Sequence, residues 1–554
     1  MRGLLTSSIG VTCAAALALP LTPPASAAPA PTAPSAEVAP VVAPDAPDLS
    51  GSTQSLPLTP LTRDRAAGAA EQGVPRRDVR PFSLLGVVWD DPDTDLDGTV
   101  QVRTRKTGTG AWSGWQDVET HYADHGADPD SAERASGHPR GATAPLWVGD
   151  SDGVEVRVRP DASHRAEGTV RGTRTPAAPA PLPAGLRLEL VDPGDTTTSA
   201  ARSKTAEAVP DTAVPDTAVP DTAVPDTAVP DAVFPDTPDT ATGARHGADA
   251  PSGRTADFLS AAALSDGTVL TADPATTRTA PSAHSARSIG AGPPRTAASA
   301  ASAVSPSVAA SAANAALAPL GASEISALDA AGTRSELLAL RGGELTKAQR
   351  AKPYIGPRPR IVTRHGWGAD EKLRESGFRY TSTVKAAFVH HSATGNSYKC
   401  SQAPSVIRSI YRYHVKSLGW RDIGYNFVVD KCGTIYEGRA GGVAKAVLGA
   451  HTLGFNTNSM GIAVLGTFTS TKPSSATVKA VASLTAWKLG LFGGNPKGKT
   501  YLKSGGGNLY PKGKNVRLNV ISGHRDGFAT ECPGRQLYGK LGSARNTAAT
   551  YQGR

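Results

Sequence analysis

Three residues in the C-terminal part of the chain have the side-chain types of a metal site. His390 is the first of the pair His390-His391, and His524 and Cys532 lie in the short stretch Gly-His-Arg-Asp-Gly-Phe-Ala-Thr-Glu-Cys-Pro. Two imidazoles and one thiolate bind Zn²⁺, and three protein ligands leave the fourth tetrahedral position for water, as in catalytic zinc sites. The residue types therefore predict a catalytic zinc site at His390, His524 and Cys532.

Alternating strand and helix patterns surround these residues, which predicts an α/β domain over residues 355–545. The predicted elements are a strand over 386–390, a helix from 404 to 418, a hairpin of 425–430 and 434–437, a strand over 461–465, a helix over 477–491 and a strand over 518–522. Both histidines then lie at strand ends, and Cys532 lies in the loop beyond the last strand. Strand ends are rigid and suit a preorganised metal centre.

The N-terminus has the pattern of a secretory signal peptide. Residues 11–21 are apolar apart from Thr12, and Ala25-Ser26-Ala27 supplies the small residues of a cleavage site. This run is too short to span a membrane, and no later segment is apolar for long enough. We therefore predict that residues 1–27 are cleaved and that the mature protein is soluble and secreted, either extracellular or associated with the cell wall.

The cysteine count bears on whether Cys532 is available to bind metal. Of four cysteines, Cys13 lies in the predicted signal peptide, which leaves Cys400, Cys432 and Cys532. Outside the cell, two of these three are expected to pair. A Cys400–Cys432 disulfide, which we predict, leaves Cys532 free to bind metal. The alternative is that Cys532 forms the disulfide and that the two histidines are incidental.

Charge is divided unevenly along the chain. The formal net charge is +9, but residues 355–554 contain 29 Lys and Arg against 8 Asp and Glu, a charge of +21, and the rest carries −12. A basic domain in an exported protein favours an anionic partner of the cell envelope over nucleic acid. Six basic residues spread among glycines form either a contact surface or a solvated loop. They are Lys497, Lys499, Lys503, Lys512, Lys514 and Arg517.

Composition divides the rest of the chain into three parts. Residues 28–79 are rich in Pro, Ala and Ser and are predicted to be disordered. Short β-type runs separated by turn residues predict a separate small all-β domain of unknown function over residues 80–191, with a sandwich as the expected form. Residues 192–354 are predicted to be a low-complexity linker, because four copies of Ala-Val-Pro-Asp-Thr form an extended spacer with few buriable side chains.

Residues from about Arg360 to Leu541 resemble the family of peptidoglycan recognition proteins and type 2 amidases, the zinc N-acetylmuramoyl-L-alanine amidases. Seven motifs carry the resemblance, and seven in the same order are specific although they cover only about a third of the chain. They are Arg-His-Gly-Trp-Gly at 364–368, Val-His-His-Ser-Ala-Thr at 389–394, Gly-Trp-Arg-Asp-Ile-Gly-Tyr-Asn-Phe at 419–427, Tyr-Glu-Gly-Arg at 436–439, Gly-Ala-His-Thr at 449–452, Asn-Ser-Met-Gly-Ile at 458–462, and Gly-His-Arg-Asp through Cys-Pro-Gly at 523–534. The resemblance implies a central mixed β-sheet flanked by helices.

The resemblance also implies a role for each matched residue. His390, His524 and Cys532 match the zinc ligands of the family. Tyr425 matches the main catalytic residue that is not a ligand, and Thr530 stands where some phage members have Lys. Four further residues are expected to bind substrate, although for the first of them a packed structural role is the alternative: His391, His451, Arg439 and Asn456.

These roles describe a hydrolytic zinc centre. Zinc lowers the pKa of bound water to about 7 and polarises a carbonyl. Hydroxide would then attack the amide carbon between the lactyl group of muramic acid and L-alanine in peptidoglycan. Tyr425 would orient the water or donate to the oxyanion, with Thr530 as a second hydrogen-bonding group. The chain has no His-Glu-x-x-His motif, so a glutamate base of the zincin type is not available.

Two other functions are compatible with parts of this pattern. A non-catalytic peptidoglycan-binding protein of the same fold is one, although such members typically lack the cysteine ligand that is present here as Cys532. A hydrolase with Cys532 as nucleophile is the other. Gly441 stands where members that prefer diaminopimelate often have Trp, which leaves the stem-peptide preference open. We expect a monomer that binds peptidoglycan and anionic cell-wall polymers, binds no nucleic acid and does not span a membrane.

Overall fold

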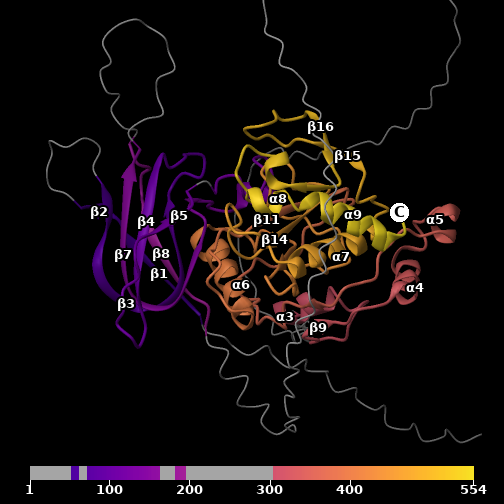
Figure 1. Ribbon diagram of the computed structural model, residues 1–554, viewed down its shortest axis with the longest axis horizontal. Coiled ribbons are helices and arrows are strands. Elements are labelled where there is room, and N and C mark those ends of the chain that lie inside the picture. The colour runs from indigo at the N-terminus through magenta and orange to yellow at the C-terminus, as the bar shows by residue number, and fades with distance from the viewer. Residues whose placement is uncertain (1–50, 62–70, 121, 162–180, 195–303) are drawn as a thin grey trace, which may run out of the picture. The chain divides into compact units, whose positions relative to one another are not determined.

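The computed structural model describes residues 51–61, 71–120, 122–161, 181–194 and 304–554 (Figure 1). The ranges up to residue 194 form an all-β domain, here called the β-domain, and residues 304–554 form an α/β domain. The predicted fold class is confirmed. The predicted signal peptide and the Ala-Val-Pro-Asp-Thr repeats lie outside the described residues.

The β-domain is built on one antiparallel sheet with the strand order β1-β8-β3-β7-β4-β5. Its strands are β1 (Ser52–Pro57), β2 (Thr59–Pro60), β3 (Gln72–Trp89), β4 (Gly98–Lys106), β5 (Gln116–Val118), β6 (Gly141–Ala142), β7 (Leu146–Pro160) and β8 (Arg187–Asp192). In β7, Val154, Val156 and Val158 alternate with polar residues and are fully buried, as expected where one face of a strand packs on a core. Register shifts between β3 and β7 mark bulges, which bend and twist such long strands.

A long connection joins β5 to β6 in the β-domain. We call residues 119–140 the β5–β6 segment; residue 121 within it is not described. It contains one short helix, α1 (Ala132–Ser136), whose first turn is capped by the side chain of Ser131. Connections of more than about 12–15 residues are uncommon in compact domains and are usually functional or disordered. Apart from residue 121, the whole β5–β6 segment is described by the structure, and it packs against the α/β domain.

The α/β domain has a mixed sheet with the strand order β17-β11-β14-β12-β13-β10-β9. Strands β17, β11, β14 and β12 run parallel to one another, and β13 pairs antiparallel with β12. The strands are β9 (Glu324–Ile325), β10 (Ile361–Val362), β11 (Ala386–His391), β12 (Phe427–Val429), β13 (Ile435–Glu437), β14 (Ser459–Val464) and β17 (Ile521–Gly523). A separate hairpin consists of β15 (Lys499–Lys503) and β16 (Asn515–Asn519).

Helices cover both faces of this sheet, which explains why its strands are apolar throughout. On β14, Ile462 and Val464 point into the core under α7 (Ser475–Leu491) and α9 (Leu541–Gln552), which lie side by side in Figure 1. Ala463, between them, belongs to the core on the opposite face, under α6 (Ala403–Arg412). Strands buried on both faces lose the polar–apolar alternation of a half-exposed strand. The helix α8 (Arg535–Tyr538) follows the metal-site loop.

The β-domain packs directly on α6 and on the helical turn of residues 413–417 that continues it. Leu84 and Val191 of the β-domain share a core cluster with Ile407 and Ile410 of α6. Three polar contacts reinforce this packing, listed by donor and acceptor: Tyr413 Oη to the Thr143 carbonyl at 3.1 Å, Ser417 Oγ to Glu189 Oε2 at 2.9 Å, and Arg408 Nε to the Pro193 carbonyl at 3.1 Å. A shared apolar core distinguishes this arrangement from two domains on a flexible tether.

The described elements extend beyond two of the predicted boundaries. Residues 304–354, predicted as the end of the linker, contain α3 (Pro306–Ala312), β9, α4 (Ala330–Arg341) and α5 (Lys347–Ala351). Ile325 and Leu337 from this stretch are buried in the core of the α/β domain. The stretch is rich in Ala and Ser, as is the linker before it. In the β-domain, β1 and most of the first half of β3 precede residue 80. None of the helices in the described part of the chain is long and apolar enough to cross a bilayer.

Candidate metal centre

The three predicted ligands meet at the ends of two neighbouring parallel strands. His390 lies near the end of β11, His524 directly follows β17, and the two strands are paired. The Nδ1 atoms of His390 and His524 are 3.1 Å apart, and Cys532 Sγ is 3.8 Å from His390 Nδ1. Zinc bonds of about 2.0–2.3 Å in a tetrahedron put ligand atoms roughly 3.3–3.6 Å apart. The residues therefore fit a zinc-sized ion.

Hydrogen bonds on the far side of each imidazole leave one nitrogen free for metal. His524 Nε2 lies 3.1 Å from the backbone carbonyl of Asp124, so it carries the proton and donates it. His390 Nε2 lies 3.3 Å from His451 Nδ1 and 3.4 Å from Thr452 Oγ1. Such partners orient ligating histidines and set their tautomer. Nδ1 of both His390 and His524 is thereby directed to the centre.

Burial keeps the two histidines neutral. It lowers the pKa of His390 well below its ordinary value and that of His524 to about 3, although the Asp124 charge acts in the opposite direction on His524. A neutral imidazole is the form that binds metal. Burial likewise raises the pKa of the Cys532 thiol, with the Asp124 charge adding to the effect. A cation at the centre would reverse this for the thiol, because a coordinating thiol is deprotonated outright.

A fourth group at the centre comes from the β-domain. One ligand atom from each of His125, His390, His524 and Cys532 lies within 4.8 Å of the others, and all four residues are buried. His125 Nδ1 is 2.6 Å from a carboxylate oxygen of Asp124. His125 Nε2 is buried and has no hydrogen-bond partner in the described part of the chain. A buried polar atom without a partner requires an explanation, and a metal ion at this centre supplies one.

His125 was not among the predicted ligands. The sequence predicts a water molecule in the fourth tetrahedral position of the site. The available signal was compositional: a long stretch between β-type runs that contains several acids and histidines, namely His121, Asp124, His125, Asp128, Asp130, Glu133 and His138. Nothing in the sequence relates this stretch to the three predicted ligands, which lie hundreds of positions further along the chain.

The two predicted catalytic residues lie beside the centre. The Tyr425 ring is 5.5 Å from that of His390, and its hydroxyl is 3.2 Å from the Tyr122 hydroxyl of the β5–β6 segment. Tyr122 Oη in turn lies 2.7 Å from His414 Nε2. Burial raises the pKa of Tyr425 well above its ordinary value, so the hydroxyl keeps its proton. Thr530 is half-buried, and its hydroxyl accepts the backbone N–H of Cys532 at 3.2 Å.

Two of the predicted substrate-binding residues form hydrogen bonds with side chains of the β5–β6 segment. Arg439 donates two hydrogen bonds of 2.8 Å to the carboxylate of Glu133, and both side chains are buried. Asn456 Nδ2 donates to Asp128 Oδ1 at 2.7 Å. Asn456 Oδ1 accepts a hydrogen bond from the backbone N–H of His451 at 2.7 Å, and this bond holds the loop next to the centre.

The other two predicted substrate-binding residues are buried histidines. His451 is fully buried, and its Nδ1 faces His390 Nε2. His391 Nδ1 accepts the backbone N–H of Phe468 at 3.4 Å, and its Nε2 is 3.6 Å from Glu119 at the start of the β5–β6 segment. In this conformation neither is open to solvent, and their binding role stays a prediction.

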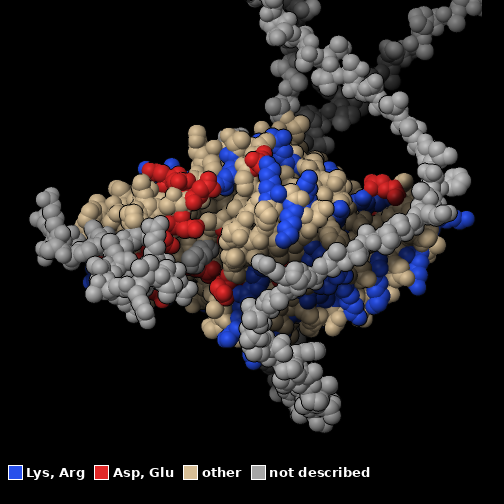
Figure 2. All heavy atoms as spheres, turned by 90° about the horizontal axis from the view of Figure 1, so that it is seen from above, with Lys and Arg blue, Asp and Glu red and all other residues tan. Residues whose placement is uncertain are grey.

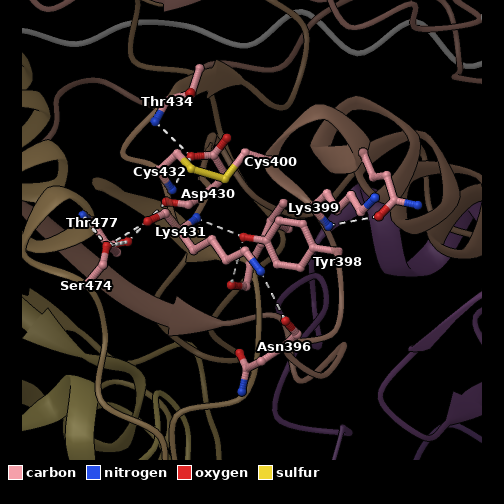
Figure 3. The surroundings of a disulfide bond; sticks show 12 residues. Asn396, Tyr398, Lys399, Cys400, Asp430, Lys431, Cys432, Thr434, Ser474 and Thr477 are labelled. Carbon is pink, nitrogen blue, oxygen red and sulfur yellow. Dashed lines mark hydrogen bonds between the residues drawn. A yellow bond between two sulfur atoms is a disulfide. The ribbon is translucent and has the colours of Figure 1, made fainter. Parts of the chain in front are cut away.

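The predicted disulfide between Cys400 and Cys432 is confirmed (Figure 3). It ties the start of the α6 region to the turn between β12 and β13. In that turn, Asp430 Oδ1 accepts the backbone N–H groups of Cys432 and Thr434, both at 2.9 Å. Because the other two are bonded to each other, Cys532 is the free cysteine among the described residues, which leaves it available for metal.

The six basic residues singled out in the sequence are exposed on or next to the β15–β16 hairpin. Figure 2 shows Lys and Arg gathered over the α/β domain and Asp and Glu toward the β-domain. One of the six, Lys512, pairs with Asp130 of the β5–β6 segment.

The mixed sheet thus carries two histidines at the ends of paired strands, with one cysteine in the loop that follows. A family model described as N-acetylmuramoyl-L-alanine amidase matches residues 380–535, and one described as Rv3811 N-terminal galactose-binding domain-like matches residues 31–182. Peptidoglycan-recognition protein SC2 of Drosophila simulans is 30% identical over 191 residues, which are 34% of this chain and 88% of that protein. The chain therefore belongs to the peptidoglycan recognition protein family.

Further similar proteins each match a third of the chain or less. Peptidoglycan-recognition protein LE of Drosophila melanogaster is 36% identical over 126 residues, 23% of this chain and 35% of that protein. Among solved structures, Drosophila PGRP-LB is 25% identical and covers 33% of this chain and 92% of its own, with a TM-score of 0.27.

Proposed function

We propose that this protein is a secreted, zinc-dependent N-acetylmuramoyl-L-alanine amidase that hydrolyses the bond between the muramic lactyl group and L-alanine of peptidoglycan. The observation that carries the proposal is the convergence of His390, His524 and Cys532 at the strand ends of the family's fold. Zn²⁺ in this ligand set would supply a hydroxide near neutral pH and polarise the scissile carbonyl.

The chain's own residues support this chemistry from fixed positions. Tyr425 keeps its proton and can donate a hydrogen bond to an oxyanion that forms at the amide carbon. Thr530 offers a second hydroxyl from the loop that carries Cys532. Glu437 acts elsewhere: its carboxylate accepts from Asn314 Nδ2 at 2.9 Å and from the backbone N–H of Arg364 at 3.2 Å, so it supports the fold.

Two alternatives are weaker on the same observations. A binding protein without activity has no need for a complete ligand set, and Cys532 is buried beside both histidines. A cysteine nucleophile needs a thiolate, which low-pKa cysteine sites obtain from positive neighbours. Burial raises the pKa of Cys532 instead, and His390 and His524 stay neutral.

Digestion of muropeptides followed by mass analysis of the products tests the proposal. The zinc-loaded His125→Ala variant, which lacks the fourth buried side chain at the centre, should release the intact stem peptide, lose this activity with a chelator and regain it with Zn²⁺. A cysteine hydrolase would survive the chelator and be lost to a thiol-alkylating reagent. Binding of muropeptides without any release of stem peptide by the zinc-loaded His125→Ala variant would contradict the amidase assignment.

The charge of the surface points to a second binding partner. The exposed basic residues of the β15–β16 hairpin favour an anionic polymer of the cell wall. Less protein should therefore sediment with purified cell walls as salt is added. At low salt, the variant with both Lys499→Glu and Arg517→Glu should sediment less than the wild type.

A further inference from the structure

We propose that the β5–β6 segment holds this protein in a latent form, with His125 as the fourth metal ligand and the rest of the segment seated in the substrate cleft. The part that concerns the metal stands by itself, and the part that concerns latency rests on the proposed amidase function.

The first argument is the geometry around His125. The Asp124 carboxylate holds Nδ1, and Nε2 is left buried and without a hydrogen bond in the described part of the chain. A carboxylate–histidine pair of this kind is the usual mount of a metal-ligating imidazole. The His125 ring also packs edge-on against that of His524, with centroids 4.6 Å apart. His125 thus takes the place that a catalytic zinc site keeps open for water.

The second argument is where the rest of the segment lies. Three of its residues form hydrogen bonds with predicted site residues of the α/β domain. The hydroxyl of Tyr122 lies within hydrogen-bond distance of that of Tyr425. Asp128 accepts from the side-chain amide of Asn456, and Glu133 accepts from the guanidinium of Arg439. The three partners in the α/β domain are residues that the family resemblance assigns to catalysis or to substrate. One continuous segment therefore occupies the groups that a muropeptide would use.

The contact between Glu133 and Arg439 shows that this placement is specific. It is bidentate, and both side chains are buried. Bidentate Arg–carboxylate pairs are directional, and removal of one partner leaves a buried charge uncompensated. A stem peptide carries carboxylates of its own, so it can replace Glu133 on Arg439 without leaving that charge unpaired. The segment and the substrate would thus compete for the same groups.

Metal coordination by His125 can be tested without any assay of hydrolysis. The full-length protein is loaded with Co²⁺, and the visible absorption spectrum is recorded for wild type, His125→Ala and His138→Ala. His138 is the matched control, because it is an exposed histidine of the same segment. We expect His125→Ala to change the d–d bands and to speed metal loss to a chelator by roughly 10–100-fold. His138→Ala should match the wild type.

An unchanged Co²⁺ spectrum and unchanged metal loss in His125→Ala would overturn the ligand assignment. His125→Gln serves as a second variant if the alanine variant does not fold, since it keeps a polar side chain next to Asp124. Failure to bind Co²⁺ in wild type would overturn the proposal at its base. These readouts do not depend on which bond the enzyme cleaves.

Occupation of the cleft is tested by the Glu133→Gln variant, with Asp130→Asn as control. Both changes remove one negative charge from the segment, but Asp130 is exposed and pairs with Lys512 at the surface. We expect Glu133→Gln to raise muropeptide affinity at least about tenfold, and Glu133→Gln combined with His125→Ala to raise turnover by a similar factor as well, while Asp130→Asn leaves both near wild type. Equal affinity in wild type and Glu133→Gln would overturn latency. If affinity rises but no variant releases stem peptide, latency of binding holds and the amidase function fails.

Discussion

The four groups at the metal centre are mounted in two different ways. His390 and His524 are carried by paired strands in the middle of the α/β sheet, and Cys532 lies in the loop that follows the second of these strands. His125 is carried by the β5–β6 segment, which belongs to the β-domain and packs in buried contact with the α/β domain beside the centre. The two histidines of the first mount are fixed relative to each other by the paired strands. Under the latency proposal, the second mount has to leave the centre while both domains stay folded.

The largest expected effect is at the rigid mount. Cys532→Ser, made in the His125→Ala background so that the β5–β6 segment neither supplies a ligand nor masks activity, should reduce bound zinc and amidase activity to background, because only His390 and His524 then remain. Metal analysis of the purified protein and muropeptide digestion measure the two effects. Removal of the other cysteines together, by Cys400→Ser with Cys432→Ser, should leave zinc content unchanged. Full zinc retention in this double variant would show that Cys532 is not a ligand.

Tyr425→Phe should affect catalysis but not the metal. Loss of one donor to an oxyanion typically costs about 10²–10³ in kcat. We expect a decrease of this order with normal zinc content, measured in the His125→Ala background so that the β5–β6 segment does not mask it. Tyr501→Phe, which changes an exposed tyrosine of the β15–β16 hairpin, is the control. A change in zinc content instead would assign Tyr425 to the mount.

The stability of the α/β domain, whose sheet carries the rigid mount, should depend on pH through Glu437 of β13. Burial raises the pKa of this carboxyl to about 7, against 4.5 ordinarily. Because the folded state holds the proton more tightly, the contribution to stability is complete below about pH 4.5 and is lost as pH rises through about 7. The loss is on the order of 3 kcal/mol. Urea unfolding of wild type and Glu437→Gln between pH 5 and 8 measures it, and parallel pH profiles would refute the shift.

The smallest expected effect is at the removable mount. Asp124→Asn keeps the backbone carbonyl that His524 donates to but removes the carboxylate charge from His125. We expect metal loss to a chelator to become about 10-fold faster, in line with other partners of metal-ligating histidines. If it equals or exceeds the effect of His125→Ala, Asp124 acts on the centre by a route other than His125.

Elements that depend on local pattern were predictable. The strand that carries His390 shows as the apolar run Ala386–Val389, and α7 was predicted over 477–491 against Ser475–Leu491 in the structure. The Cys400–Cys432 disulfide followed from cysteine parity and from the places of both residues near one edge of the predicted sheet. Residues 304–354 were not recognised as folded, because small alanine-rich helices bury few large side chains and resemble a linker in composition.

By itself the sequence determined the chemistry that this protein can offer: the types and order of His390, His524 and Cys532, Tyr425 beside them and a free thiol outside the disulfide. These are properties of side chains and of short motifs, so a linear pattern carries them. Only the tertiary structure decided that His125, Asp128 and Glu133 lie on the same site. That contact arises from an apolar interface between β-domain residues and α6, and such packing of distant segments leaves no periodic trace in the sequence.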